Sequence, residues 1–100
     1  MRRDEVIAKL KQAEPQLREV GIAALYLFGS HARGEVGPDS DVDVFVDPKS
    51  DSDLGFTRYV EAYEVLRQTL GENVELGYST RAGLSPHVRE VIEKEAIQVF

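Results

Sequence analysis

The sequence predicts an α+β fold of two layers, in which a small mixed β-sheet has helices packed on one face. Three observations support this. The 100 residues suit one compact domain covering residues 1–100. Hydrophobic residues make up 42% of the chain, which is enough for a modest core. Helical and strand-like patterns also follow one another in the order helix, strand, turn, strand, helix, strand, helix, without a repeat or a linker.

Apolar residues recur at three- and four-residue spacing at the start of the chain. The recurring positions are Val6, Leu10, Ala13 and Leu17. This spacing predicts a helix over residues 4–13. Pro15 interrupts it, because proline inside a helix removes a hydrogen bond, but proline is tolerated at the first position of a new segment. We therefore expect a second short helix over residues 15–20, ended by Gly21.

Two strands are predicted next. Residues 22–28 are an apolar run that is typical of a buried strand, and Gly29-Ser30 breaks it before a possible short helix at 30–36. Residues 41–46 alternate between acidic or aromatic residues and valines. Because side chains alternate across a strand, Asp41 and Asp43 should share one face and the valines the other.

The second half of the chain continues the pattern. A polar loop at 47–53 ends in Asp53, which can cap a helix running to Leu70, where Gly71 stops it. Residues 74–78 predict a third strand. Ser85-Pro86 is a helix start signal for the last helix, and residues 97–100 can add a short terminal strand. Helices would cover one face of the sheet and leave the other for a site.

Composition excludes several classes of function. The net charge of −6 disfavours general nucleic-acid binding, although a nucleotide can still bind through a divalent metal. The absence of cysteine excludes disulfides and thiolate zinc sites, and two isolated histidines disfavour a histidine metal site. We expect His31 to face solvent. The N-terminus lacks the continuous apolar stretch of a signal peptide, and no apolar run approaches the length of a membrane span, so we expect a cytoplasmic protein.

The informative stretch joins a glycine–serine turn to a pair of acids. Gly29 would let a phosphate approach the backbone, and the N–H groups and hydroxyl that follow can donate to its oxygens. Two carboxylates on one strand face repel each other, and a divalent cation relieves that repulsion. Mg²⁺ prefers oxygen ligands and usually combines one or two carboxylates with substrate phosphates. The stretch therefore predicts Mg²⁺–nucleotide chemistry.

These residues resemble the minimal nucleotidyltransferase family of the DNA polymerase β-like superfamily. The positions that match its pattern are Gly29, Ser30, Ala32, Arg33, Gly34, Ser40, Asp41 and Asp43. The resemblance extends over nearly the whole chain and implies a nucleotidyltransferase fold. It implies that Gly29 and Ser30 hold the nucleotide phosphates. We expect Arg33 and Ser40 to belong to the same nucleotide site, with Arg33 alternatively paired to an acid such as Glu35.

The same resemblance implies a metal site of three acids. Asp41 and Asp43 would be metal ligands, and Glu75 stands where the family usually has a third acid, an aspartate that can activate the attacking hydroxyl. The extra methylene of Glu75 shifts its carboxylate, and a misplacement of about 1 Å can cost about 10²-fold in rate. Glu75 could alternatively be a surface charge on an edge strand. The expected cofactor is Mg²⁺, as two ions, with ATP as the substrate.

Family members of this length and pattern are typically antitoxins of HEPN/MNT toxin–antitoxin modules. The resemblance therefore implies transfer of AMP from ATP to a tyrosine hydroxyl of a HEPN-domain toxin. Two alternatives stay open. The chain could neutralise its partner by binding alone, which the glutamate at Glu75 favours, or it could modify a small molecule. A homo- or hetero-oligomer is also an open expectation, because so small a core can depend on a partner.

Overall fold

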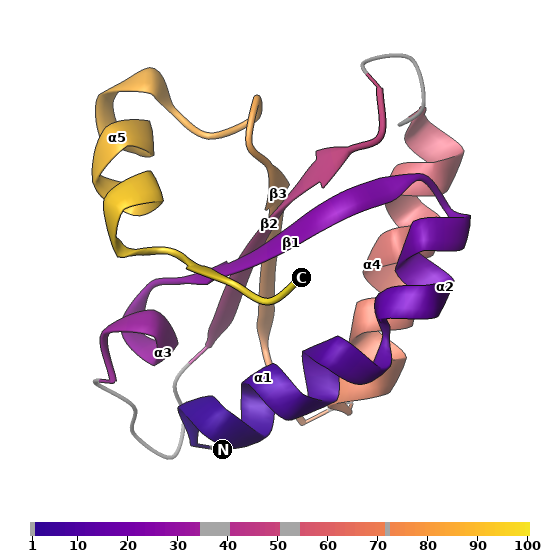
Figure 1. The fold of residues 1–100 in the computed structure, drawn as a ribbon, viewed down its shortest axis with the longest axis horizontal. Coiled ribbons are helices and arrows are strands. Elements are labelled where there is room, and N and C mark those ends of the chain that lie inside the picture. The colour runs from indigo at the N-terminus through magenta and orange to yellow at the C-terminus, as the bar shows by residue number, and fades with distance from the viewer. Residues whose placement is uncertain (1, 35–40, 51–54, 72) are drawn as a thin grey trace.

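A computed structural model describes residues 2–34, 41–50, 55–71 and 73–100. Within them, five helices and four strands follow the predicted order (Figure 1). The elements are α1 (Arg3–Gln12), α2 (Glu14–Glu19), β1 (Ile22–Phe28), α3 (Ser30–Arg33), β2 (Val42–Pro48), α4 (Phe56–Leu70), β3 (Leu76–Thr80), α5 (Pro86–Glu95) and β4 (Ile97–Gln98). None of the described helices is both long and apolar enough to cross a membrane.

The sheet is mixed, as the sequence predicts. Its strand order is β3-β2-β1-β4, so β1 and β2 are central. β1 pairs with β2 and with β4 in antiparallel fashion, whereas β2 and β3 are parallel. A parallel pair needs a crossover connection, and α4 supplies it. The start of β2 therefore lies beside the end of β1 and the start of β3.

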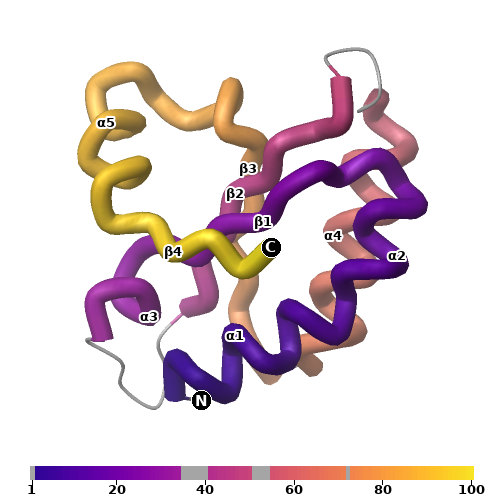
Figure 2. Tube along the Cα trace, viewed as in Figure 1, coloured from indigo at the N-terminus to yellow at the C-terminus, as the bar shows by residue number. Residues whose placement is uncertain are grey.

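The core lies between the sheet and α1, α2 and α4, which all cover one face (Figures 1 and 2). Val42, Val44 and Val46 of β2 are fully buried there. The helices and the other strands contribute Val6, Leu10, Ala13, Leu17, Ile22, Leu25, Leu27, Ala62, Leu66 and Leu70. The valine face of the predicted alternation is thus the core face, and Asp43 and Phe45 lie on the opposite face.

That opposite face is partly covered by α3 and α5 (Figure 1). Phe45 is fully buried on it and stacks on Tyr26, with ring centroids 4.8 Å apart. The Arg81 guanidinium lies over both rings and pairs with Asp47 and with Glu93 of α5. These contacts join α5 to the far end of β2, away from Asp43.

Four boundaries differ from the prediction in ways that concern the site. β2 begins at Val42 rather than at Asp41, so Asp41 immediately precedes the strand. α3 ends at Arg33, because Gly34 adopts the left-handed conformation (φ +75°) that closes a helix. β3 begins at Leu76 rather than at Val74, so Glu75 immediately precedes the strand. α4 begins at Phe56 after Gly55; the predicted cap, Asp53, lies outside the described residues.

Candidate active site

Asp43 is the centre of the candidate site. It pairs with Phe28 of β1 on one side and with Gly77 of β3 on the other. A Cβ atom placed on Gly29 would lie 2.5 Å from its Oδ2 atom, and one on Gly77 would lie even closer to Oδ1. The carboxylate of Asp43 therefore lies between Gly29, in the turn after β1, and Gly77 of β3, where no side chain fits.

The turn after β1 brings its backbone against this carboxylate. Gly29 has φ +76° and ψ −153°, a conformation that is essentially restricted to glycine. Ser30 then begins α3, and the Arg33 N–H donates to the Gly29 carbonyl oxygen at 3.1 Å. The predicted proximity of the glycine–serine turn to the acid at Asp43 is what the structure has.

The surroundings of Asp43 raise its pKa above the ordinary value of 3.8. Burial is the largest cause and the charge of Asp41 adds to it, while His31 and Arg33 act in the opposite direction. A divalent cation would oppose both of the causes that raise this pKa. The carboxylate oxygens are ligands that Mg²⁺ prefers, so the residues present fit that ion.

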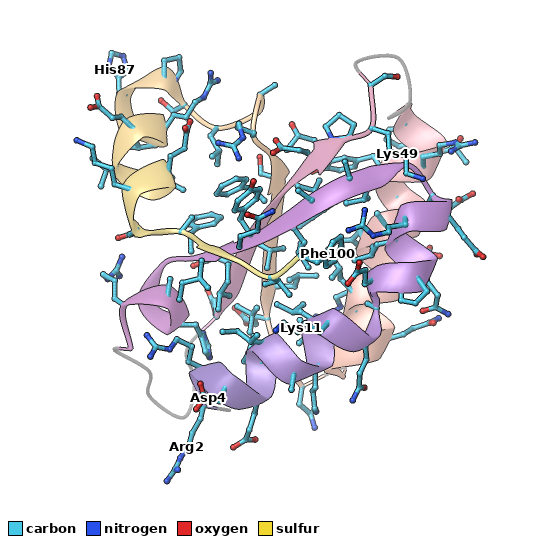
Figure 3. All side chains as sticks on the ribbon, viewed as in Figure 1. Arg2, Asp4, Lys11, Lys49, His87 and Phe100 are labelled. Atoms are coloured by element: carbon cyan, nitrogen blue, oxygen red, sulfur yellow. The ribbon has the colours of Figure 1, made fainter. Side chains whose placement is uncertain are left out.

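His31 is buried, with 1% of its surface exposed, so the expectation that it faces solvent is wrong. Its Nδ1 atom lies 2.9 Å from the carbonyl oxygen of Asp41. Since a carbonyl oxygen only accepts, Nδ1 carries the proton and donates. His31 thereby connects α3 to Asp41, the residue that immediately precedes β2. A four-residue helix has too little periodicity to reveal this burial in the sequence. The other histidine, His87, is exposed at the outer end of α5 (Figure 3).

Arg33 pairs with a residue far away in the sequence. Its Nη1 atom lies 3.1 and 3.2 Å from the two carboxylate oxygens of Glu95, the last residue of α5. The Gly29 N–H also donates to Glu95 Oε1, at 3.4 Å. Structural pairing of Arg33 is thus observed, with Glu95 as a partner; Glu35 lies outside the described residues. Glu95 was not among the predicted site residues, because no local pattern relates positions that lie 62 residues apart.

Two further predicted site residues, Asp41 and Glu75, lie at the same end of the β2–β3 pair as Asp43. Asp41 is exposed just before β2, and Glu75 is exposed just before β3. The Val42 N–H donates to the Glu75 carbonyl oxygen at 2.9 Å, so Asp41 and Glu75 immediately precede the starts of two neighbouring strands. Within the described residues, no three acids or histidines are grouped closely enough to hold a metal ion as they stand. Ser40 lies outside the described residues.

A mixed four-stranded sheet that sets an Asp-x-Asp strand beside a glycine–serine turn is the architecture of a small nucleotidyltransferase. Comparison with known families gives the same class, because residues 4–99 match the nucleotidyltransferase domain. The chain belongs to the nucleotidyltransferase domain family and is an enzyme of that class. The resemblance inferred from the glycine–serine and acidic motif is confirmed.

Relatives and solved structures support this membership. The protein adenylyltransferase MntA of Thermococcus cleftensis is 36% identical over 93 residues, which cover 89% of this chain and 92% of that protein. A solved structure of a minimal nucleotidyltransferase has a TM-score of 0.80 and 28% identity, and the match covers 97% of this chain and 95% of the other. A toxin–antitoxin structure with AMP-PNP has a TM-score of 0.67, covers 90% of this chain and 72% of the other, and at 19% identity shows a shared fold.

Proposed function

We propose that this chain is an antitoxin that transfers AMP from ATP, with Mg²⁺, to a tyrosine hydroxyl of a HEPN-domain toxin. The observation that carries the proposal is the position of the Asp43 carboxylate between Gly29 and Gly77, against the glycine–serine turn. Further support comes from the relative that is named a protein adenylyltransferase and from the shared fold with an antitoxin–toxin structure that contains AMP-PNP.

The turn after β1 would hold the nucleotide phosphates. Gly29 has no side chain to block their approach, and the Ser30 hydroxyl and nearby N–H groups can donate to phosphate oxygens. Arg33 is near enough to Asp43 to lower its pKa, so its positive charge lies close to where the phosphates would meet the acids. Ser40, which lies outside the described residues, would complete this group.

The acids at the strand starts would hold the metal. Asp43 and Asp41 would bind Mg²⁺, as two ions, and Glu75 would join them from the start of β3. The bound metal would supply neutralisation of phosphate charge. In the transfer, the tyrosine oxygen bonds to the α-phosphorus and the bond from that phosphorus to the oxygen bridging to the β-phosphate breaks, so pyrophosphate leaves. The phenol proton passes to a carboxylate, for which Glu75 is our candidate.

Labelled ATP tests the proposal directly. The protein would be incubated with Mg²⁺, ATP labelled at the α-phosphate, and the protein encoded by the neighbouring gene. We expect label on a tyrosine of that partner with the wild type and with Glu64→Gln, which removes an exposed charge from α4. We expect no label with Asp43→Asn. Absence of label with the wild type would falsify the adenylyltransferase proposal.

Neutralisation by binding alone is the second candidate, and one observation favours it. Asp41, Asp43 and Glu75 are not gathered into a three-acid group in the described structure, and Glu75 is a glutamate. A double variant, Asp41→Ala with Asp43→Ala, separates the two candidates in cells that produce the toxin. Full protection by this variant supports masking, whereas loss of protection with retained binding excludes it.

A further inference from the structure

The carboxylate of Glu95 contacts two of the groups to which we assign the nucleotide phosphates. It accepts from the Gly29 N–H at 3.4 Å and lies 3.1 and 3.2 Å from Arg33 Nη1. The Glu95 side chain is 23% exposed and the Arg33 side chain is 43% exposed. An acidic side chain thus already occupies an anion-binding position on the turn that follows β1.

A carboxylate and a phosphate are recognised by the same donors. Backbone N–H groups and a guanidinium bind either anion through charge-assisted hydrogen bonds. Glu95 and a triphosphate therefore cannot both use the same donor hydrogens of Arg33 and Gly29 to the full. A negative charge that stayed beside the bound phosphates would also repel them.

We propose that Glu95 is an internal anion that occupies Arg33 and the Gly29 N–H until a triphosphate replaces it, and that it thereby sets the affinity for nucleotide. This inference rests on the proposed function, because it needs the turn to bind phosphate. Glu95 acts here through Arg33 and Gly29 and is a positioning residue rather than a catalytic one.

The surroundings of Glu95 allow the exchange without unfolding α5. Glu95 is the last residue of that helix, and α5 is held to the sheet elsewhere by the ion pair of Glu93 with Arg81, at 3.1 Å. A rotation of the Glu95 side chain would then be enough to free the two donors. The Arg33–Glu95 ion pair is partly exposed, so its competition should weaken nucleotide binding only modestly, by about two- to fivefold.

Binding of the Mg²⁺ complex of AMP-PNP and of inorganic tripolyphosphate, measured by calorimetry, tests this inference. We expect Glu95→Gln to bind both ligands about two- to fivefold more tightly than the wild type. The matched control is Glu90→Gln, which removes the same charge from α5 at a residue paired with Lys94. It should change affinity little. In an Arg33→Gln background, Glu95→Gln should lose most of its effect, because the competition acts through Arg33.

Each result decides the question. Tighter binding by Glu95→Gln that disappears without Arg33 supports the inference, and tighter binding shown equally by Glu90→Gln overturns it in favour of a long-range charge effect. Weaker binding by Glu95→Gln, at an unchanged Tm, also overturns it and makes Glu95 a residue that the bound state needs. If the wild type binds the ligands and Glu95→Gln binds them with the same affinity, the inference alone is rejected. If neither protein binds them, the phosphate site is rejected, and with it the proposed function.

Discussion

Gly77 is a suitable position at which to perturb Asp43, because the three nearest atoms of the described residues to an added Cβ all belong to Asp43. Gly77 does not have a positive φ, so alanine fits its backbone without strain. Gly29 is a poorer choice, because alanine there would also be strained at φ +76°. Gly77→Ala therefore isolates the effect of displacing one carboxylate.

The displacement can be worked out from the structure. Ordinary contacts of a Cβ atom begin at 3.4 Å, whereas a Cβ atom on Gly29 would lie 2.5 Å from Asp43 Oδ2. Relief of a clash of that size moves the carboxylate by about 0.9 Å. A Cβ atom on Gly77 would overlap the carboxylate even more. Misplacement of a reacting or positioning group by about 1 Å costs roughly 10²-fold in rate. We therefore expect kcat/KM to fall by about 10²-fold, which corresponds to roughly 2.7 kcal/mol of transition-state stabilisation.

The assay is the transfer of α-phosphate label from ATP, with metal titrated in each reaction. Gly55→Ala is the matched control, since no atom of the described residues lies within 4 Å of a Cβ at that position. It should keep wild-type activity. If Gly77→Ala has wild-type kcat/KM and wild-type metal dependence, the carboxylate between the two glycines is not the centre of the site. Circular dichroism would show whether the variant is folded at the assay temperature. A loss of activity caused by unfolding would thereby be distinguished from one caused by displacement of the carboxylate.

Three further predictions concern Asp43, His31 and Arg81. Because burial and Asp41 raise the pKa of Asp43, ionised Asp43 destabilises the folded state as the pH rises above the ordinary value of 3.8. Asp43→Asn should therefore raise the Tm of the metal-free protein at pH 7, and this gain in Tm should shrink toward pH 4. The variant should also lose any stabilisation by Mg²⁺. His31→Phe keeps the buried ring but loses the donor to the Asp41 carbonyl, so urea unfolding should show about 1 kcal/mol less stability, and unchanged stability would contradict that role. Arg81→Met should cost about 1–2 kcal/mol by the same measurement, because it loses two ion pairs and its position over two rings; Arg58→Met, on the exposed surface of α4, is the control.

The parts of the fold that could be predicted are those that local patterns determine. The apolar run predicted β1 at residues 22–28, and the period of two in β2 separated its core valines from Asp43. The start of β3 was missed by two residues, because the apolar Val74 is partly buried against the core cluster without being in the strand. Apolar character reports burial in this case, whereas strand bounds depend on pairing with β2.

The parts of the site that escaped prediction depend on contacts between distant segments. Glu95 contacts Arg33 and Gly29, which lie 62 and 66 residues away in the sequence. These contacts form only because α5 packs against the sheet. Gly77 also looked like an ordinary strand residue. Its role follows from its parallel register with Asp43, which no pattern within β3 reveals. The acids themselves were visible because charge interrupts an apolar strand, which is costly unless the charge has a use.

The position of the Asp43 carboxylate depends on the core on the other face of β2. In β2 the buried valines alternate with Asp43, Phe45 and Asp47, so a slip of one residue would place carboxylates in the core. Burial of the valines therefore fixes which face the acids occupy. β2 is also paired on both sides, and each neighbour contributes one glycine, Gly29 or Gly77, to the space around Asp43. Mutations in the valine core that shift β2 should thus reduce activity before they unfold the protein, because the site tolerates a smaller displacement than the fold does.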